Sequence, residues 1–177
     1  MWSNRFLNQF KFSTFFISQL CNINLKQLKT MEKRININTV EPQAFKAMLG
    51  LEGYLAQSEI SKTIKELIKI RASQINNCAY CLAMHTKDAL KYGESAERIF
   101  ILSAWHEAEK FFTEEEMVAL KMTEEITQIS QQGLSNETYQ RALEVFSEKQ
   151  IAEIIMAIVT INAWNRIAVS THLQIGE

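Results

Sequence analysis

The sequence predicts an all-α, single-domain protein, a helical bundle of about six or seven helices, and three observations lead to this assignment. Five Gly and one Pro in 177 residues are too few for a turn-rich β-sandwich or a dinucleotide-binding α/β protein. Apolar residues recur at helical spacing between residues that cap helices. No strand-like alternation, internal repeat or low-complexity linker interrupts them, and the length suits one domain.

The first two expected helices begin near Pro42 and Ser61. Proline suits a first helical turn, and the apolar residues after Pro42 are spaced for one buried face. Asn76 and Asn77 end the second helix, since Asn accepts turn and left-handed geometry readily. The residues expected to face inward are Phe45, Met48, Leu49 and Leu55 on the first helix and Ile64, Leu67, Ile68 and Ile75 on the second. On the second helix, Lys62, Lys65 and Lys69 are expected to face water.

Five further helices are placed by residues that start or stop a helix. A Ser or Thr side chain accepts from first-turn N–H groups, and Glu or Gln three residues later completes a capping box. Glycine adopts the left-handed conformation that ends many helices. These signals predict helices over 78–92, 95–104 and 113–131, and two more that begin at 135 and 147. Capping boxes are expected at Thr113 with Glu116 and at Ser147 with Gln150. Gly93 and Gly133 are expected to end the helices that precede them.

The last of these helices is apolar on more than one face. A helix of this kind is usually surrounded on several sides. Either it lies at the centre of one chain's core or it forms a subunit interface, and both can hold together. Its apolar residues are Ile151, Ile154, Ile155, Ile158, Val159, Ile161 and Trp164.

Composition and charge exclude several function classes. Hydrophobic residues at 47% and charged residues at 22% are globular values, and no stretch approaches the roughly 20 uninterrupted apolar residues of a membrane span. A net charge of -1 lacks the positive field that phosphate backbones require. We therefore expect no membrane and no nucleic acid among the partners.

Residues 1–30 form a basic, aromatic N-terminal extension, unlike residues 31–177, which we assign to the domain itself. The extension has no acidic residue and contains five of the ten Phe. It could be an export signal or an organellar transit peptide, but we favour translation from a start codon upstream of a natural start at Met31. We expect the extension to be irregular or loosely docked, with Cys21 an unpaired surface thiol. Its basic residues are Arg5, Lys11, Lys26 and Lys29.

The residues with catalytic potential lie between positions 66 and 85. Cys78 and Cys81 form a C-x-x-C at a helix start, where free N–H groups favour thiolate and lower a cysteine pKa from about 8.5. His85 lies four residues after Cys81, so the imidazole and both sulfurs share one helical face. Proximity to this base favours Cys81 as the activated thiol, whereas the helix dipole favours Cys78, and the two arguments compete.

A carboxylate should orient the imidazole or accept its proton, and Glu66 on the preceding helix is the candidate. Alternatives exist for each residue. The two cysteines could be buried core residues, or they could bind zinc with His85 if His106 or Glu66 supplied a fourth ligand. His106 and His172 are expected to be a partly exposed polar residue and a tail residue.

These residues resemble the AhpD-like alkylhydroperoxidases of the carboxymuconolactone decarboxylase superfamily. That family's motif is Glu, eleven residues, Cys, two residues, Cys, three residues, His, and the segment ELIKIRASQINNCAYCLAMH meets it with Glu66, Cys78, Cys81 and His85. The resemblance covers roughly residues 31–176. Three further segments contribute to it: Arg71-Ala72-Ser73, Ala104-Trp105 with the helix start at Thr113, and INAWNRIAVST at 161–171.

The resemblance implies a thiol-dependent hydroperoxide reductase, an antioxidant enzyme. It assigns Cys81 as the peroxidatic cysteine and Cys78 as the resolving cysteine, with His85 and Glu66 as the proton relay. It further implies a hydroperoxide substrate, a lipoyl- or thioredoxin-type dithiol reductant, a homotrimer or homohexamer, and no metal or organic cofactor. Some AhpD proteins carry a second His between the cysteines where this chain has Tyr80, and a phenol that titrates near 10 is no base near neutrality.

Two other functions stay open. A lactone decarboxylase of the same superfamily would work by acid and base without needing paired cysteines. A non-enzymatic redox sensor would form a disulfide without turnover. Because a catalytic C-x-x-C must be re-reduced in each cycle, we expect a cytoplasmic location.

Overall fold

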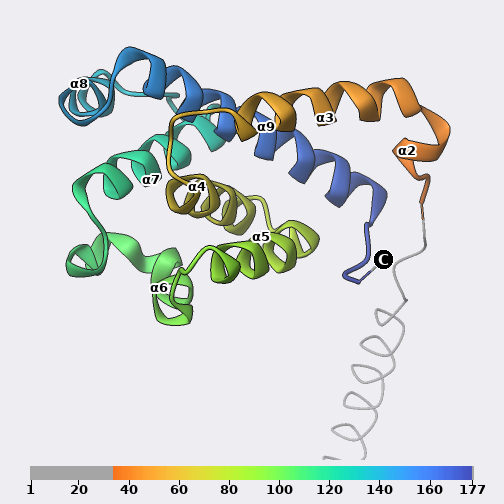
Figure 1. Ribbon diagram of the computed structural model, residues 1–177, viewed down its shortest axis with the longest axis horizontal. Helices are drawn as coiled ribbons and strands as arrows, with labels where there is room; N and C mark the ends of the chain where they lie inside the picture. The colour runs from red at the N-terminus through yellow and green to blue at the C-terminus, as the bar shows by residue number, and fades with distance from the viewer. Residues whose placement is uncertain (1–33, 177) are drawn as a thin grey trace, which may run out of the picture. The chain divides into compact units, whose positions relative to one another are not determined.

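The computed structural model describes residues 34–176, which form helices joined by turns, with no strand in that range. The all-α prediction is therefore confirmed (Figure 1). The predictions for residues 1–30, including Met31 as start and Cys21, lie outside the described residues. The helices are α2 (Ile37–Val40), α3 (Pro42–Ala56), α4 (Lys62–Ile75), α5 (Ala79–Lys91), α6 (Ala96–Ile101), η1 (Leu102–Glu107), η2 (Glu109–Phe111), α7 (Glu114–Thr127), α8 (Asn136–Val145) and α9 (Glu148–Thr171).

Helix α9 is the centre of the described fold. It packs against α3, α4, α5, α7 and α8, and Figure 1 shows it in blue beside α3, α4 and α7. By length and composition α9 could cross a membrane, but 56% of its apolar window is buried inside the fold, as in a core helix. The core interpretation of this helix is confirmed, and a subunit interface on its exposed residues stays a prediction.

The helix starts follow the capping signals in the sequence. Ser61 caps α4 and Ser95 caps α6, each accepting a hydrogen bond from an N–H group in the first turn. Both predicted capping boxes are present, one at the start of α7 and one at the start of α9. The box residues are Thr113 with Glu116 and Ser147 with Gln150.

The α4–α5 turn has the predicted geometry. Asn77 adopts φ 53°, and Asn76 caps the end of α4. The Cys78 N–H donates to the Ser73 carbonyl at 3.0 Å, so the chain reverses within a few residues. Helices α4 and α5 consequently lie side by side.

Two predicted faces differ from the structure. Lys69, expected to face water, is buried, and its ammonium group lies 3.4 Å from Glu52 Oε2 and 3.6 Å from Glu66 Oε1. Opposite charges compensate the loss of hydration there. Leu49, expected to be buried, is exposed, because α3 contacts the core mainly near its C-terminal end at Leu55.

Two predicted helix boundaries also differ. The helix from 113 ends at Thr127, and residues 128–132 form turns before Gly133, which has φ 72°. The helix expected over 95–104 becomes a short α-helix followed by 3₁₀ turns, with a break at Ala104. A 3₁₀ turn places residues three apart on one side, so both Leu102 and Trp105 are buried.

The position of α9 predicts unequal effects of truncation at neighbouring residues. Ile158 is 0% exposed and Val159 is 44% exposed. Ile158→Ala should lower the free energy of unfolding by about 2–5 kcal/mol because it leaves a cavity, whereas Val159→Ala should stay within about 0.5 kcal/mol. Urea unfolding of both variants measures this. An equally large loss at Val159 would contradict the assignment of that face to solvent and indicate a subunit interface.

Candidate active site

The two cysteines of the C-x-x-C occupy the start of α5 and are both free thiols. Cys78 is the N-cap residue, and its sulfur accepts a hydrogen bond from the Cys81 N–H at 3.4 Å. Each cysteine is 1% exposed. Cys78 thus takes the place that Ser or Thr has at the starts of α4, α6, α7, α8 and α9, where a side-chain oxygen accepts from a first-turn N–H.

The electrostatics of the pair favour a negative charge on Cys78. A hydrogen bond from the Cys81 thiol lowers the pKa of Cys78 to about 6, against the opposing effect of burial, and N–H groups at the helix start contribute in the same direction. The same hydrogen bond, together with burial, raises the pKa of Cys81. The charge on Cys78 thus depends first on the neighbouring Cys81 thiol, with the N–H groups of the helix start as smaller contributions.

The imidazole and the carboxylate come together as the spacing predicts. His85 Nδ1 lies 2.8 Å from Glu66 Oε2, and both side chains are buried. The Lys69 ammonium lies 3.6 Å from the other Glu66 oxygen. Since a carboxylate accepts, His85 donates to Glu66 from Nδ1, and Nε2 is the ring nitrogen that does not contact Glu66.

The sequence analysis did not predict the side chains that pair with Glu66 on the side away from His85. Lys69 bridges Glu66 to Glu52, and Glu52 Oε1 accepts from the Trp164 indole N–H at 2.9 Å. The spacing of Lys69, three residues after Glu66 on one helix, could have suggested the first contact. The contacts of Glu52 and Trp164 join α3 to α9, and local spacing carries no signal for them.

A second missed group lies on α9 behind the cysteines. Asn165 is 1% exposed, its Nδ2 donates to Ser73 Oγ at 3.0 Å, and its Oδ1 accepts from Asn76 Nδ2 at 2.9 Å. The nearby Asn165 carboxamide lowers the pKa of Cys78 and acts in the same direction on the pKa of Cys81. The resemblance included the segment around Asn165, but nothing in that segment alone indicated that Asn165 lies near the cysteines.

Other predicted polar residues lie apart from this site. His106, with a side chain 51% exposed, bonds Glu124 Oε2 at 2.9 Å, and Arg71 pairs with Glu124 Oε1 at 2.7 Å. A cavity of about 700 Å³ lies beside His106 and is lined by none of the four motif residues. Within residues 34–176 no three His, Cys, Asp or Glu side chains are arranged to hold a metal ion.

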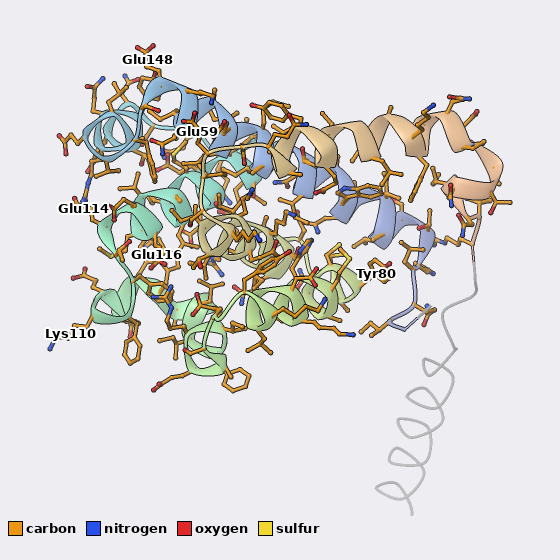
Figure 2. All side chains as sticks on the ribbon, in the orientation of Figure 1. Glu59, Tyr80, Lys110, Glu114, Glu116 and Glu148 are labelled. Atoms are coloured by element: carbon orange, nitrogen blue, oxygen red, sulfur yellow. The ribbon has the colours of Figure 1, made fainter. Side chains whose placement is uncertain are left out.

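The cysteine cluster is covered by larger side chains. Cys78 and Cys81 belong to a buried cluster with Ala72, Ile161 and Ala168. Figure 2 labels Tyr80, at the N-terminal end of α5. The side chains that pack against the cluster and shield it are Tyr80, Trp164 and Leu173.

A buried dithiol at a helix start, next to a carboxylate-backed imidazole in an all-α fold, defines the class of AhpD-like proteins. The sequence profile described as "Carboxymuconolactone decarboxylase family" matches residues 42–125. The chain is 42% identical over 140 residues to the uncharacterised protein YdfG of Bacillus subtilis strain 168, covering 79% of this chain and 95% of YdfG. The chain belongs to the AhpD-like proteins of the carboxymuconolactone decarboxylase superfamily.

Solved structures agree with this assignment. One is a crystal structure of ATU0492 from Agrobacterium tumefaciens, a protein of unknown function suggested to be the antioxidant defence protein AhpD. It shares 37% sequence identity with this chain at a TM-score of 0.79, and the match covers 82% of this chain and 99% of ATU0492. The debrominase Bmp8 shares the fold at 22% identity and a TM-score of 0.67, covering 76% of this chain and 72% of its own. The likeness to Bmp8 extends to the fold alone.

The lowered Cys78 pKa predicts thiolate at mildly acidic pH. In the reduced protein, ultraviolet thiolate absorbance should persist down to about pH 6, where Cys78 takes up its proton, instead of falling near the ordinary value of about 8.5. Cys78→Ser should abolish this titration. A wild-type midpoint above pH 8 would contradict the assigned charge.

Proposed function

We propose that the protein is a thiol-dependent hydroperoxide reductase with Cys81, Cys78, His85 and Glu66 as its catalytic residues. The observation that carries the proposal is the buried thiol–thiolate pair on the same helix as a carboxylate-backed imidazole. A thiolate is the reactive form towards peroxide, and a second sulfur in hydrogen-bonding contact can resolve the product.

The reaction balances with the two cysteines, a hydroperoxide and an external dithiol. The Cys81 thiolate attacks a peroxide oxygen, the O–O bond breaks, and the alkoxide leaves and is protonated to an alcohol, leaving a sulfenic acid. The Cys78 sulfur then attacks the Cys81 sulfur, the S–O bond breaks, and the departing hydroxide is protonated to water. An external dithiol returns two electrons by thiol–disulfide exchange, which restores both thiols.

The electrostatics of the resting pair define what the relay must do. Because Cys81 retains its proton while Cys78 carries the charge, Cys81 needs a base before it can attack. His85 lies one turn further along the same helix, with Nδ1 held by Glu66 and Nε2 out of contact with that carboxylate. We assign to His85 the transfer of the Cys81 proton and of a proton to the leaving oxygen.

The proposed partners follow from this cycle. The substrate is a hydroperoxide, and the reductant is a lipoyl- or thioredoxin-type dithiol. We propose a homo-oligomer, a trimer or hexamer. No step requires a metal or an organic cofactor.

The first test removes the attacking sulfur. Cys81→Ser should abolish dithiol oxidation that depends on an organic hydroperoxide, because no sulfenic acid can form at position 81. The measurement is anaerobic turnover, with mass spectrometry to locate a Cys78–Cys81 disulfide after one equivalent of peroxide. The matched control is Cys21→Ser, which lies outside the motif and should keep wild-type activity.

Other outcomes of this test identify the alternatives. Unchanged turnover in Cys81→Ser would refute the proposal. Lactone decarboxylation that survives thiol alkylation would instead indicate the acid–base branch of the superfamily. Loss of two thiols per chain to one disulfide, without turnover, would indicate a redox sensor.

A second test removes the base. His85→Asn should lower the rate of Cys81 oxidation by about 100-fold to 10,000-fold, the usual contribution of a positioned general base. His106→Asn is the matched control, since His106 also pairs with a glutamate, at 2.9 Å, but lies outside the cysteine site. Stopped-flow measurement of peroxide consumption compares the two. Equal rates in both variants would exclude His85 from the proton transfer.

A further inference from the structure

We propose that Lys69 is a positioning residue of the active site, whose ammonium group balances the charge of Glu66 and so leaves His85 uncharged for its role as a base. For its place in turnover the inference rests on the proposed function. The charge on the imidazole can be measured without any peroxide.

Lys69 is buried although its side chain ends in a charged group. It lies three residues after Glu66 on α4, so both side chains project from one face of that helix. Its ammonium group lies 3.6 Å from Glu66 Oε1 and 3.4 Å from Glu52 Oε2. A buried ammonium group is costly unless opposite charges compensate it, and these two carboxylates do so.

The Glu66 carboxylate lies between this ammonium group and the imidazole. Its Oε1 faces Lys69, and its Oε2 accepts from His85 Nδ1 at 2.8 Å. Both oxygens belong to one planar group, so Lys69 and His85 hold the carboxylate from two sides. The attraction between Lys69 and Oε1 therefore helps to direct Oε2 at the ring.

A buried carboxylate needs a positive charge nearby, and the source of that charge decides whether His85 can act as a base. If His85 were the only partner, the carboxylate would favour an imidazolium ion, which has no lone pair to accept the Cys81 proton. The Lys69 ammonium supplies the charge instead and repels a second positive charge on the ring. Lys69 transfers no proton or electron, so the balance of the reaction is unchanged.

Glu52 and Trp164 hold the ammonium group in place. Glu52 Oε1 accepts from the Trp164 indole N–H at 2.9 Å, while Glu52 Oε2 faces Lys69. The Trp164 ring in turn meets the Phe45 ring edge to face, with centroids 5.4 Å apart. Contacts from α3 and α9 thus keep Lys69 where it acts on Glu66.

The neighbouring lysine on α4 is engaged elsewhere. Lys65 lies one residue before Glu66, but its ammonium group donates to the Leu55 carbonyl at 2.9 Å and to Ser58 Oγ at 3.1 Å. It therefore acts on the Glu66 charge from outside the ion pair.

The neighbours of His85 on the other elements add no positive charge. On α5 the titratable neighbours are Cys78 and Cys81, and the negative charge on Cys78 favours imidazolium. From α9 come Trp164 and Asn165, which are uncharged. The proposed role of Lys69 is thus to oppose the two negative charges that would otherwise protonate the ring.

The first test measures the charge on His85 in the reduced protein, without peroxide or dithiol. Lys69→Met removes the ammonium group and keeps an unbranched side chain, so a proton should enter the Glu66–His85 pair. At neutral pH, ring ¹⁵N signals should report imidazolium, or the tautomer with hydrogen on Nε2, in about tenfold larger population than in wild type. Wild-type signals in Lys69→Met, with native circular dichroism, would overturn the proposal.

Two variants are matched controls for this measurement. Lys69→Arg keeps the positive charge and should keep the wild-type ring signals. Lys62→Met removes an exposed lysine charge from the same helix and should also keep them. Changed signals in Lys62→Met as large as those in Lys69→Met would overturn the assignment to Lys69.

Glu52→Gln covers the case in which Lys69→Met does not fold. It removes a negative charge beside Lys69 and keeps an oxygen that can accept from Trp164. The lysine charge then acts on Glu66 with less opposition, so the His85 imidazolium should be roughly threefold less populated than in wild type at the same mildly acidic pH. An equal or larger population would overturn the proposal.

Turnover separates this proposal from the proposed function. If His85 is the base, Lys69→Met should slow Cys81 oxidation about tenfold at neutral pH, and a higher pH should restore the rate by removing the added proton. A slower rate that no pH restores would overturn the role of Lys69. Changed ring signals in a protein that reduces no peroxide would refute the proposed function and leave the effect of Lys69 on His85 established.

Discussion

The reversal of the chain at Asn76 and Asn77 is the constraint on which the site depends. Asn77 takes a left-handed conformation, the Cys78 N–H closes onto the Ser73 carbonyl, and α5 returns alongside α4. Only in this arrangement can Glu66, twelve positions before Cys78 in the printed sequence, reach the imidazole of His85 at 2.8 Å. The same reversal leaves Cys78 at the first turn of α5, where N–H groups stabilise its charge. One turn thus positions the acid–base pair and the thiolate together.

Helix α9 provides the core packing and further polar contacts around the site. Its apolar residues fill the core, while Trp164 donates to Glu52, which pairs with Lys69, and Asn165 donates to Ser73. Buried polar groups of this kind stabilise a fold only when each finds its partners. Their hydrogen bonds are satisfied across three or more helices, so the geometry of the site and the packing of the core are interdependent.

The features that could be predicted from the sequence are those determined by interactions between residues close together in the chain. Helix starts were predictable because the side chain of Ser or Thr bonds an N–H only three residues away, as at Thr113 and Ser147. The meeting of Glu66 with His85 was predictable because a tight turn and two helical periods determine it. The end of the helix from Thr113 was not, since residues 128–132 form turns before the glycine that signals the stop.

The unpredicted features depend on contacts between distant segments. Lys69 looked like a surface lysine because its burial requires Glu52 from α3 as a second partner. The burial of Asn165 near the cysteines depends on the packing of α9 against α4 and α5. Which cysteine holds the charge depends on the direction of the hydrogen bond between two thiols, and sequence spacing leaves that direction open.

In the proposed cycle, the near-complete enclosure of the sulfurs would make the oxidative and reductive steps depend on the size of the reagent. With each cysteine 1% exposed beneath Tyr80, Trp164 and Leu173, any reagent needs a transient opening of the side chains that shield the pair. A hydroperoxide of a few atoms requires a smaller and more frequent opening than a dithiol carried on another protein. Oxidised protein would then accumulate whenever peroxide is plentiful, and the steady state would be governed by how often this shell of side chains admits the larger reagent.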